Sequence, residues 1–180
     1  MREIVLPETK PALEWVNGRA LQKVSPQRKH ALAQSVFVSA LLAWAMEHGT
    51  GRVGTEWEFR VQPPGEDRRP LVPDVAYLSY DTLSYEADDE ADIPRVAPDA
   101  AVEIMSPGDL GRDIEEKIRV YLAAGASVVF LVDTNARAVT ACDRIGRVTF
   151  DDRMMLSHSA LPNFSMSVRS LFEQPKPRGR

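Results

Sequence analysis

One stretch of the sequence restricts the fold more than any other. Ala100–Met105 is an apolar, strand-like run, and the amphipathic segment that follows it ends at Gly125. Ser127–Asp133 is then continuously apolar and rich in β-branched residues, as buried strands are. The order predicts a buried strand, a helix over about Pro107–Ala124, and a second buried strand.

The rest of the chain supplies further elements of both kinds. Asn17-Gly18 between two apolar runs predicts a β-hairpin, and Ser25-Pro26 predicts a helix start with Ser25 as N-cap. The other expected elements are a helix over Gln27–His48, strands at Val53–Val61 and Leu71–Leu78, and a closing antiparallel pair within 135–150. Together they predict one α/β (or α+β) domain over residues 1–180, with a mixed central sheet flanked by helices and a frayed tail from about residue 173.

Composition excludes several classes of protein. The 180 residues contain one cysteine, so an internal disulfide is impossible, and no Cys/His spacing suits a structural zinc. No apolar run has the length of a signal peptide or a membrane span, which predicts a cytoplasmic protein without a membrane partner. The net charge of −4 is uneven, because acidic residues gather in Ser84–Pro94. Net charge therefore does not decide whether nucleic acid is a partner.

Two carboxylates stand among apolar residues in neighbouring predicted strands. Glu103 lies between Val102 and Ile104, and Asp74 follows Pro73 in the strand before it. Either residue alone fits a strand end, where acidic side chains cap turns or meet water. Both together favour a shared buried site.

A lysine falls on the apolar side of the following predicted helix. At about 100° per residue, Lys117 lies within the stripe formed by Ile114, Ile118 and Tyr121. A buried ammonium needs water or an anion. It could extend to the edge of the interface or pair with Asp113 one turn earlier, and the third possibility is the two carboxylates.

Two acidic side chains and a lysine that lie close together can bind a metal ion and support catalysis. Adjacent carboxylates repel each other, and a divalent cation relieves the repulsion. Oxygen ligands favour Mg²⁺ or Mn²⁺, which polarises a phosphoryl oxygen and activates water, while a lysine stabilises developing charge. The combination predicts phosphodiester hydrolysis.

At these residues the chain resembles a known family. "PDV" at Pro73–Val75, "VEIMSP" at Val102–Pro107, "RDIEEK" and "YLAAGASVVFLVD" resemble the Uma-two family of restriction-endonuclease-like proteins, within the PD-(D/E)xK nuclease superfamily. The opening "EWVNGRALQKVSP" and the closing "LPNFSMSVRSLF" resemble the same family. The likeness covers most of the chain, and the order and spacing of the motifs make it specific.

The resemblance implies a restriction-endonuclease-like core and Mg²⁺-dependent cleavage of DNA. It implies Asp74, Glu103 and Lys117 as catalytic residues, and Asp74, Glu103 and the backbone carbonyl of Ile104 as metal ligands. The sequence departs from the superfamily pattern at Met105, where (D/E)xK has its lysine. The resemblance assigns that role to Lys117 on the following helix.

Three further residues are candidates for accessory roles. Asp99 follows a second Pro-Asp pair, although capping a turn at the strand entrance explains it equally well. Ser106 is expected to N-cap the helix and could also touch phosphate. His30 lies near the start of the long helix and could face the substrate. Because one small site cuts one strand, a homodimer is also expected.

Two alternatives to a DNA endonuclease remain open at this point. The missing lysine at position 105 and the negative charge favour an inactive nuclease fold that acts as a binding or regulatory module. A phosphohydrolase for small phosphate esters is less well supported, because neither G-x-x-x-x-G-K nor G-x-G-x-x-G occurs.

Overall fold

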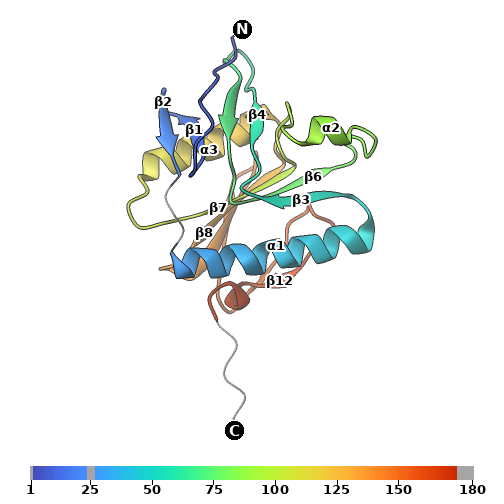
Figure 1. The fold of residues 1–180 in the computed structure, drawn as a ribbon. Coiled ribbons are helices and arrows are strands. Elements are labelled where there is room, and N and C mark those ends of the chain that lie inside the picture. Colours follow the sequence, from blue (N-terminus) through green and yellow to red (C-terminus); the bar gives the residue numbers. More distant parts are fainter. Residues whose placement is uncertain (1, 24–26, 174–180) are drawn as a thin grey trace.

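The computed structural model describes residues 2–23 and 27–173 and is built on a six-stranded mixed sheet (Figure 1). The strands follow the order β10-β9-β8-β7-β6-β3. Strands β7 and β8 are parallel, and the other neighbouring pairs are antiparallel. This arrangement confirms the predicted mixed sheet. The strand bounds are β3 Gly51–Thr55, β6 Val75–Ser79, β7 Ala100–Ile104, β8 Val128–Asp133, β9 Ala138–Cys142 and β10 Arg147–Asp151.

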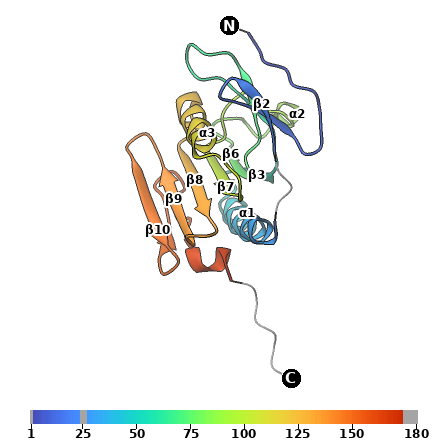
Figure 2. The same cartoon turned by 90° about the vertical axis from the view of Figure 1, so that its left-hand side faces the viewer.

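Helices cover both faces of the sheet (Figures 1 and 2). Helix α1 (Arg28–His48) packs on one face and α3 (Gly111–Ala124) on the other. Because side chains alternate along a strand, Val102 and Ile104 of β7 join the core under α1, whereas Ala101 joins the core under α3. Glu103 therefore faces the α3 side. The α1 core also receives residues of the C-terminal elements, which are β11 (Met155–Leu156), β12 (Met166–Ser167) and the 3-10 helix η1 (Val168–Leu171).

Two small sheets pack on the α3 side of the central sheet. Strands β1 (Leu13–Val16) and β2 (Arg19–Gln22) form the predicted hairpin, with positive φ at Asn17 (48°) and Gly18 (74°). These angles suit the type I′ turn that joins two-residue hairpins. The remaining elements are β4 (Phe59–Val61), which pairs with β5 (Arg69–Leu71), and the one-turn helix α2 (Asp88–Ala91).

Two strands predicted as continuous are each divided. The expected strand at 53–61 breaks after β3, where Glu56 adopts a φ of 50°, and resumes as β4 in another sheet. The expected strand at 71–78 breaks between β5 and β6, at Val72, Pro73 and Asp74. Proline has no N–H for a ladder, which accounts for a break here. The second break places Asp74 immediately before β6.

Helix α3 begins later than the sequence indicates. The expected start at Pro107 is wrong, because Gly108 has a φ of 98° and the chain turns before the helix begins at Gly111. Ser106 is consequently not the N-cap. Its N–H donates to Asp109 Oδ2 at 2.7 Å, within the turn.

Some predictions fall outside the described residues. Ser25 and Pro26 belong to the segment 24–26, and the expected frayed tail lies almost wholly within 174–180. Within the described ranges, α1 begins at Arg28, close to the predicted start. None of the helices in those ranges combines the length and apolar character needed to cross a membrane.

Candidate active site

The sheet register places Asp74 and Glu103 opposite each other. Val75 pairs with Val102 in the antiparallel ladder of β6 and β7, and Asp74 N–H donates to the Val102 carbonyl at 3.0 Å. Extending the register by one residue sets Asp74 against Glu103, and directly opposite residues share a face of the sheet. Both side chains are buried, with exposed fractions of 4% for Asp74 and 9% for Glu103. The break at Pro73 and the C-terminal end of β7 thus bring two carboxylates together.

Asp74 is surrounded by hydrogen-bond donors. Its Oδ1 accepts from Lys23 Nζ at 2.7 Å, and its Oδ2 accepts from the Ile104 N–H at 2.6 Å. His30 Nε2 lies 3.2 Å from the same Oδ2. Burial raises the pKa of Asp74, but the His30 hydrogen bond and the charge of Lys23 outweigh it and hold the pKa well below its usual range. Asp74 is therefore anionic at neutral pH.

Glu103 belongs to a different arrangement, in which two carboxylates share one lysine. Lys117 Nζ lies 2.5 Å from Glu103 Oε2 and 3.0 Å from the Glu14 carboxylate. Burial lowers the pKa of Lys117, but attraction to Glu103 and Glu14 outweighs this and raises the pKa above its usual value. Burial raises the pKa of Glu103 to about 8, a shift that Lys117 opposes and Glu14 reinforces.

Lys117 does not follow either of the two structural alternatives. Its side chain is 9% exposed, so the ammonium does not extend to water. Asp113, the possible partner one turn earlier, instead bonds Arg19 at 2.6 Å and Asn17 at 2.7 Å. These hydrogen bonds of Asp113 connect the β1–β2 hairpin to the first turn of α3.

The cluster opens into a cavity of about 700 Å³. The hairpin, the start of α1, the Pro107–Leu110 turn and α3 form its walls. Asp74, Glu103 and Lys117 lie in the lining, so the buried charges face a space that a ligand can enter.

The three accessory candidates have different positions. His30 contacts Asp74, as described above, and Ser106 lines the cavity. Asp99 lies at the other end of β7, where it accepts from the Ser79 N–H at 2.7 Å and the Thr82 hydroxyl at 2.8 Å. Asp99 therefore caps a turn and is not part of this cluster.

Sequence reasoning missed Glu14 and Lys23. Glu14 accepts the Val72 N–H at 2.8 Å in addition to bonding Lys117. Glu14 shares the buried face of β1 with Val16, and such a carboxylate on the apolar side of a hairpin was a detectable signal. Lys23 follows the hairpin and bonds Asp74, which is 51 residues away, so no local pattern indicates it.

The comparisons with known proteins agree with this architecture. The Uma2 family, described as "Putative restriction endonuclease", matches residues 4–169. The chain belongs to the Uma2 family. A solved structure from Anabaena variabilis ATCC 29413, titled "a putative nuclease belonging to DUF820", is 27% identical and superposes with a TM-score of 0.81 over 93% of each chain. No curated protein matches the chain. The predicted family and its nuclease fold are thus confirmed.

The residues present suit a hard divalent cation. Glu103 Oε1 and the Tyr121 hydroxyl are both buried and have no hydrogen-bond partner within 3.5 Å in the described ranges, although an interaction with Glu103 contributes to the raised pKa of Tyr121. No three His, Cys, Asp or Glu side chains in those ranges converge as a metal cluster. Mg²⁺ needs no such cluster, because it commonly binds one or two carboxylates and keeps several waters.

Proposed function

We propose that this Uma2 protein is a metal-dependent endonuclease that hydrolyses phosphodiester bonds in DNA. One observation carries the proposal: Asp74 and Glu103 are opposed on neighbouring strands, and Lys117 bonds Glu103 from the covering helix. Asp74 and Glu103 would hold Mg²⁺ or Mn²⁺, together with the Ile104 carbonyl. The ion, when bound, would supply Lewis-acid activation of the phosphate and of a water molecule.

The protein's own residues have distinct parts in this proposal. The Ile104 N–H holds Asp74 in position, and the lowered pKa of Asp74 keeps it anionic, so it can bind a cation. Lys117 pairs with Glu103, and its ammonium would stabilise the negative charge that develops on the phosphate in the transition state. Glu14 holds Lys117 from the far side, which fixes the direction of its ammonium. In this proposal Lys117 of α3 takes the role of the lysine that the (D/E)xK pattern has at the position of Met105.

The alternative of an inactive nuclease fold is favoured by one feature of the same site. Lys23 and Lys117 already neutralise Asp74 and Glu103 within the protein. A cation that binds here would have to compete with these ion pairs. A measurement of metal binding without DNA therefore distinguishes the endonuclease from the inactive nuclease fold.

The experiment compares wild type with Asp74→Asn. We expect wild type to nick supercoiled plasmid with Mg²⁺ or Mn²⁺ and to stop with EDTA, and Asp74→Asn to lose nicking by at least about 10²-fold. The matched control is Asp89→Asn on the exposed helix α2, which should nick like wild type. A folded wild type that binds no Mn²⁺ in calorimetry and nicks nothing would overturn the endonuclease and leave the binding module.

A further inference from the structure

The sheet has one edge whose backbone is open to a partner. Strand β10 ends the strand order, and no strand in the described ranges pairs with its outer side. In the β9–β10 hairpin the Asp143 N–H donates to the Gly146 carbonyl, and bonded pairs alternate along an antiparallel ladder. The backbone groups of Val148 and Phe150 therefore face β9, and those of Thr149 face outward.

The β10 edge is only partly protected. Natural edges carry charged side chains, proline or a covering segment, and β10, which reads Arg-Val-Thr-Phe-Asp, has charges at its two ends but an uncharged centre. Val148 is 58% exposed, and Ile145 beside the strand is 96% exposed. At the opposite edge of the sheet, Arg52 of β3 donates to the carbonyls of residues 83–85, so that loop lies against β3.

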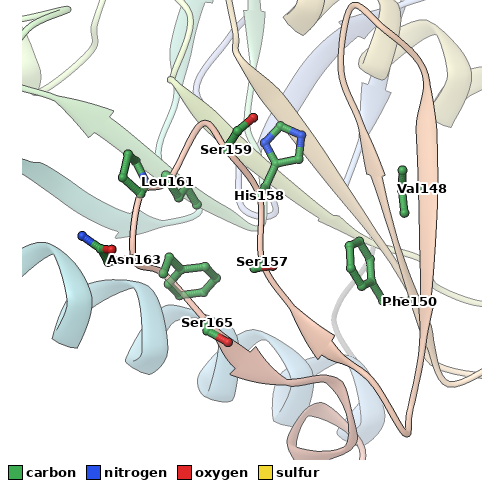
Figure 3. A pocket seen from close by; sticks show the side chains of 10 residues that line it. Val148, Phe150, Ser157, His158, Ser159, Leu161, Asn163 and Ser165 are labelled. Carbon is green, nitrogen blue, oxygen red and sulfur yellow. The ribbon is translucent and has the colours of Figure 1, made fainter.

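A hollow of about 500 Å³, lined by both apolar and polar side chains, adjoins the same strand (Figure 3). Val148 and Phe150 line it from β10, and Leu161 and Phe164 line it from the 157–165 loop. His158 Nε2 lies 3.2 Å from Asp143 Oδ2, which attaches this loop to the hairpin. The hollow thus extends the apolar surface from the strand edge onto the α1 face.

The order of residues in β10 is complementary to itself. When two copies pair antiparallel about Thr149, Arg147 of each copy lies opposite Asp151 of the other. Val148 of each lies opposite Phe150 of the other, at the mouth of the hollow. Opposite charges and aromatic–β-branched pairs are both stabilising across strands. The alternation keeps the charges on the α3 side, where Arg147 already bonds Glu115, and the apolar pair on the α1 side.

We infer that β10 is the homodimer interface, and that its occupant is β10 of a second copy. The two six-stranded sheets then continue across a two-fold axis at Thr149, the commonest symmetry for a soluble oligomer. The inference concerns assembly alone and does not rest on the proposed nuclease activity, because β8 and β9 separate β10 from β7.

The test is the mass in solution, measured by light scattering and sedimentation from micromolar to hundreds of micromolar protein. The wild type should approach twice the chain mass of 20.0 kDa. Val148→Lys should weaken the dimer at least about tenfold, because it places a charge within the apolar contact between the two copies. Val5→Lys, at an exposed valine outside β10, should not. Thermal melts verify that each variant is folded.

A charge exchange identifies the pairing itself. Arg147→Asp should weaken the dimer, and the double variant Arg147→Asp with Asp151→Arg should recover most of the loss. The contacts of Arg147 with Glu115 and of Asp151 with Arg153 remain broken in the double variant, so recovery reports the pair between copies. A monomer at every concentration overturns the inference, as does a dimer that ignores Val148→Lys and the charge exchange.

Discussion

The two carboxylates that face each other in the sheet have opposite environments. Asp74 receives hydrogen bonds from a lysine and a backbone N–H and contacts a histidine, and its pKa lies well below the usual range. Glu103 shares its single lysine with Glu14, and one of its buried oxygens accepts no hydrogen bond within 3.5 Å in the described ranges. Burial raises its pKa to about 8.

The difference shows how the fold can stabilise two neighbouring carboxylates of one candidate site to different extents. Asp74 is stabilised as an anion by the fold alone, so it is preorganised. Glu103 is incompletely compensated by the fold, so a cation gains most by binding near it. Separated pKa values in a neighbouring pair are typical of functional sites. The variants below test whether Asp74 and Glu103, with their different neighbours, respond differently to mutation, pH and metal.

Removal of Lys117 should have the largest effect. Lys117→Met keeps the stem of the side chain but leaves Glu14 and Glu103 without their shared cation. Breaking a buried ion pair costs about 3–5 kcal/mol, and loss of an electrostatic group slows catalysis by about 10²–10⁴-fold. Urea unfolding with EDTA, together with plasmid nicking, measures both effects.

A metal rescue and a control variant help to interpret the results for Lys117→Met. Added Mg²⁺ should restore part of the lost stability, because the ion binds only the folded site. Lys29→Met, at an exposed position in the first turn of α1, is the matched control and should match wild type. Equal nicking by Lys117→Met and wild type would remove Lys117 from the mechanism.

Sequence patterns indicated three members of the candidate site because these residues break local rules. Glu103 and Asp74 interrupt apolar strands, and Lys117 interrupts an apolar helical stripe, so each is visible within a few residues. The structure brings all three to one cavity. Glu14 breaks the same rule on β1, although that strand is only four residues long and its alternation is a weak signal.

Lys23 and several element boundaries could not be predicted from the local sequence. Lys23 lies beyond the regular hairpin, and its acceptors come from Val72, Asp74 and Glu56, which only the tertiary fold brings near. Element boundaries failed for a related reason. Apolar composition continues through Pro73, and the turn before α3 depends on the positive φ of Gly108, which composition does not reveal.

The raised pKa of Glu103 should make the stability of the protein fall as pH rises. Its pKa is raised from 4.5 to about 8, so the folded state binds more protons than the unfolded state between those values. Stability without metal should therefore fall as pH rises from about 5 to 8, by at most about 1.4 kcal/mol per unit. Asp74 acts in the opposite sense, and only at acidic pH, because its pKa is lowered.

Glu103→Gln tests this assignment. It should flatten the slope between pH 5 and 8 in urea unfolding with EDTA, and saturating Mg²⁺ should flatten the slope of wild type. Glu90→Gln, on the exposed helix α2, should keep the wild-type slope. An unchanged slope in Glu103→Gln would show that another group takes up the proton.

Lys23 should have the smallest effect, and one of opposite sign. Its ammonium lies 2.7 Å from Asp74 Oδ1, 2.9 Å from the Val72 carbonyl and 2.9 Å from Glu56 Oε2. It therefore holds the oxygen that a cation on Asp74 would use, and its charge repels that cation. Lys23→Met should tighten Mn²⁺ binding by up to about tenfold, or about 1.4 kcal/mol, in calorimetry without DNA.

The same variant shows whether Lys23 competes with the metal or prepares the site for it. If Lys23 mainly orients Asp74, its loss should weaken Mn²⁺ binding, which contradicts the competition. If its main partner is DNA phosphate, Mn²⁺ affinity should stay unchanged while DNA binding weakens. Lys29→Met controls for the loss of one positive charge near the start of α1. Tighter binding by Lys23→Met alone would show that Asp74, unlike Glu103, is compensated in a way that the cation must displace.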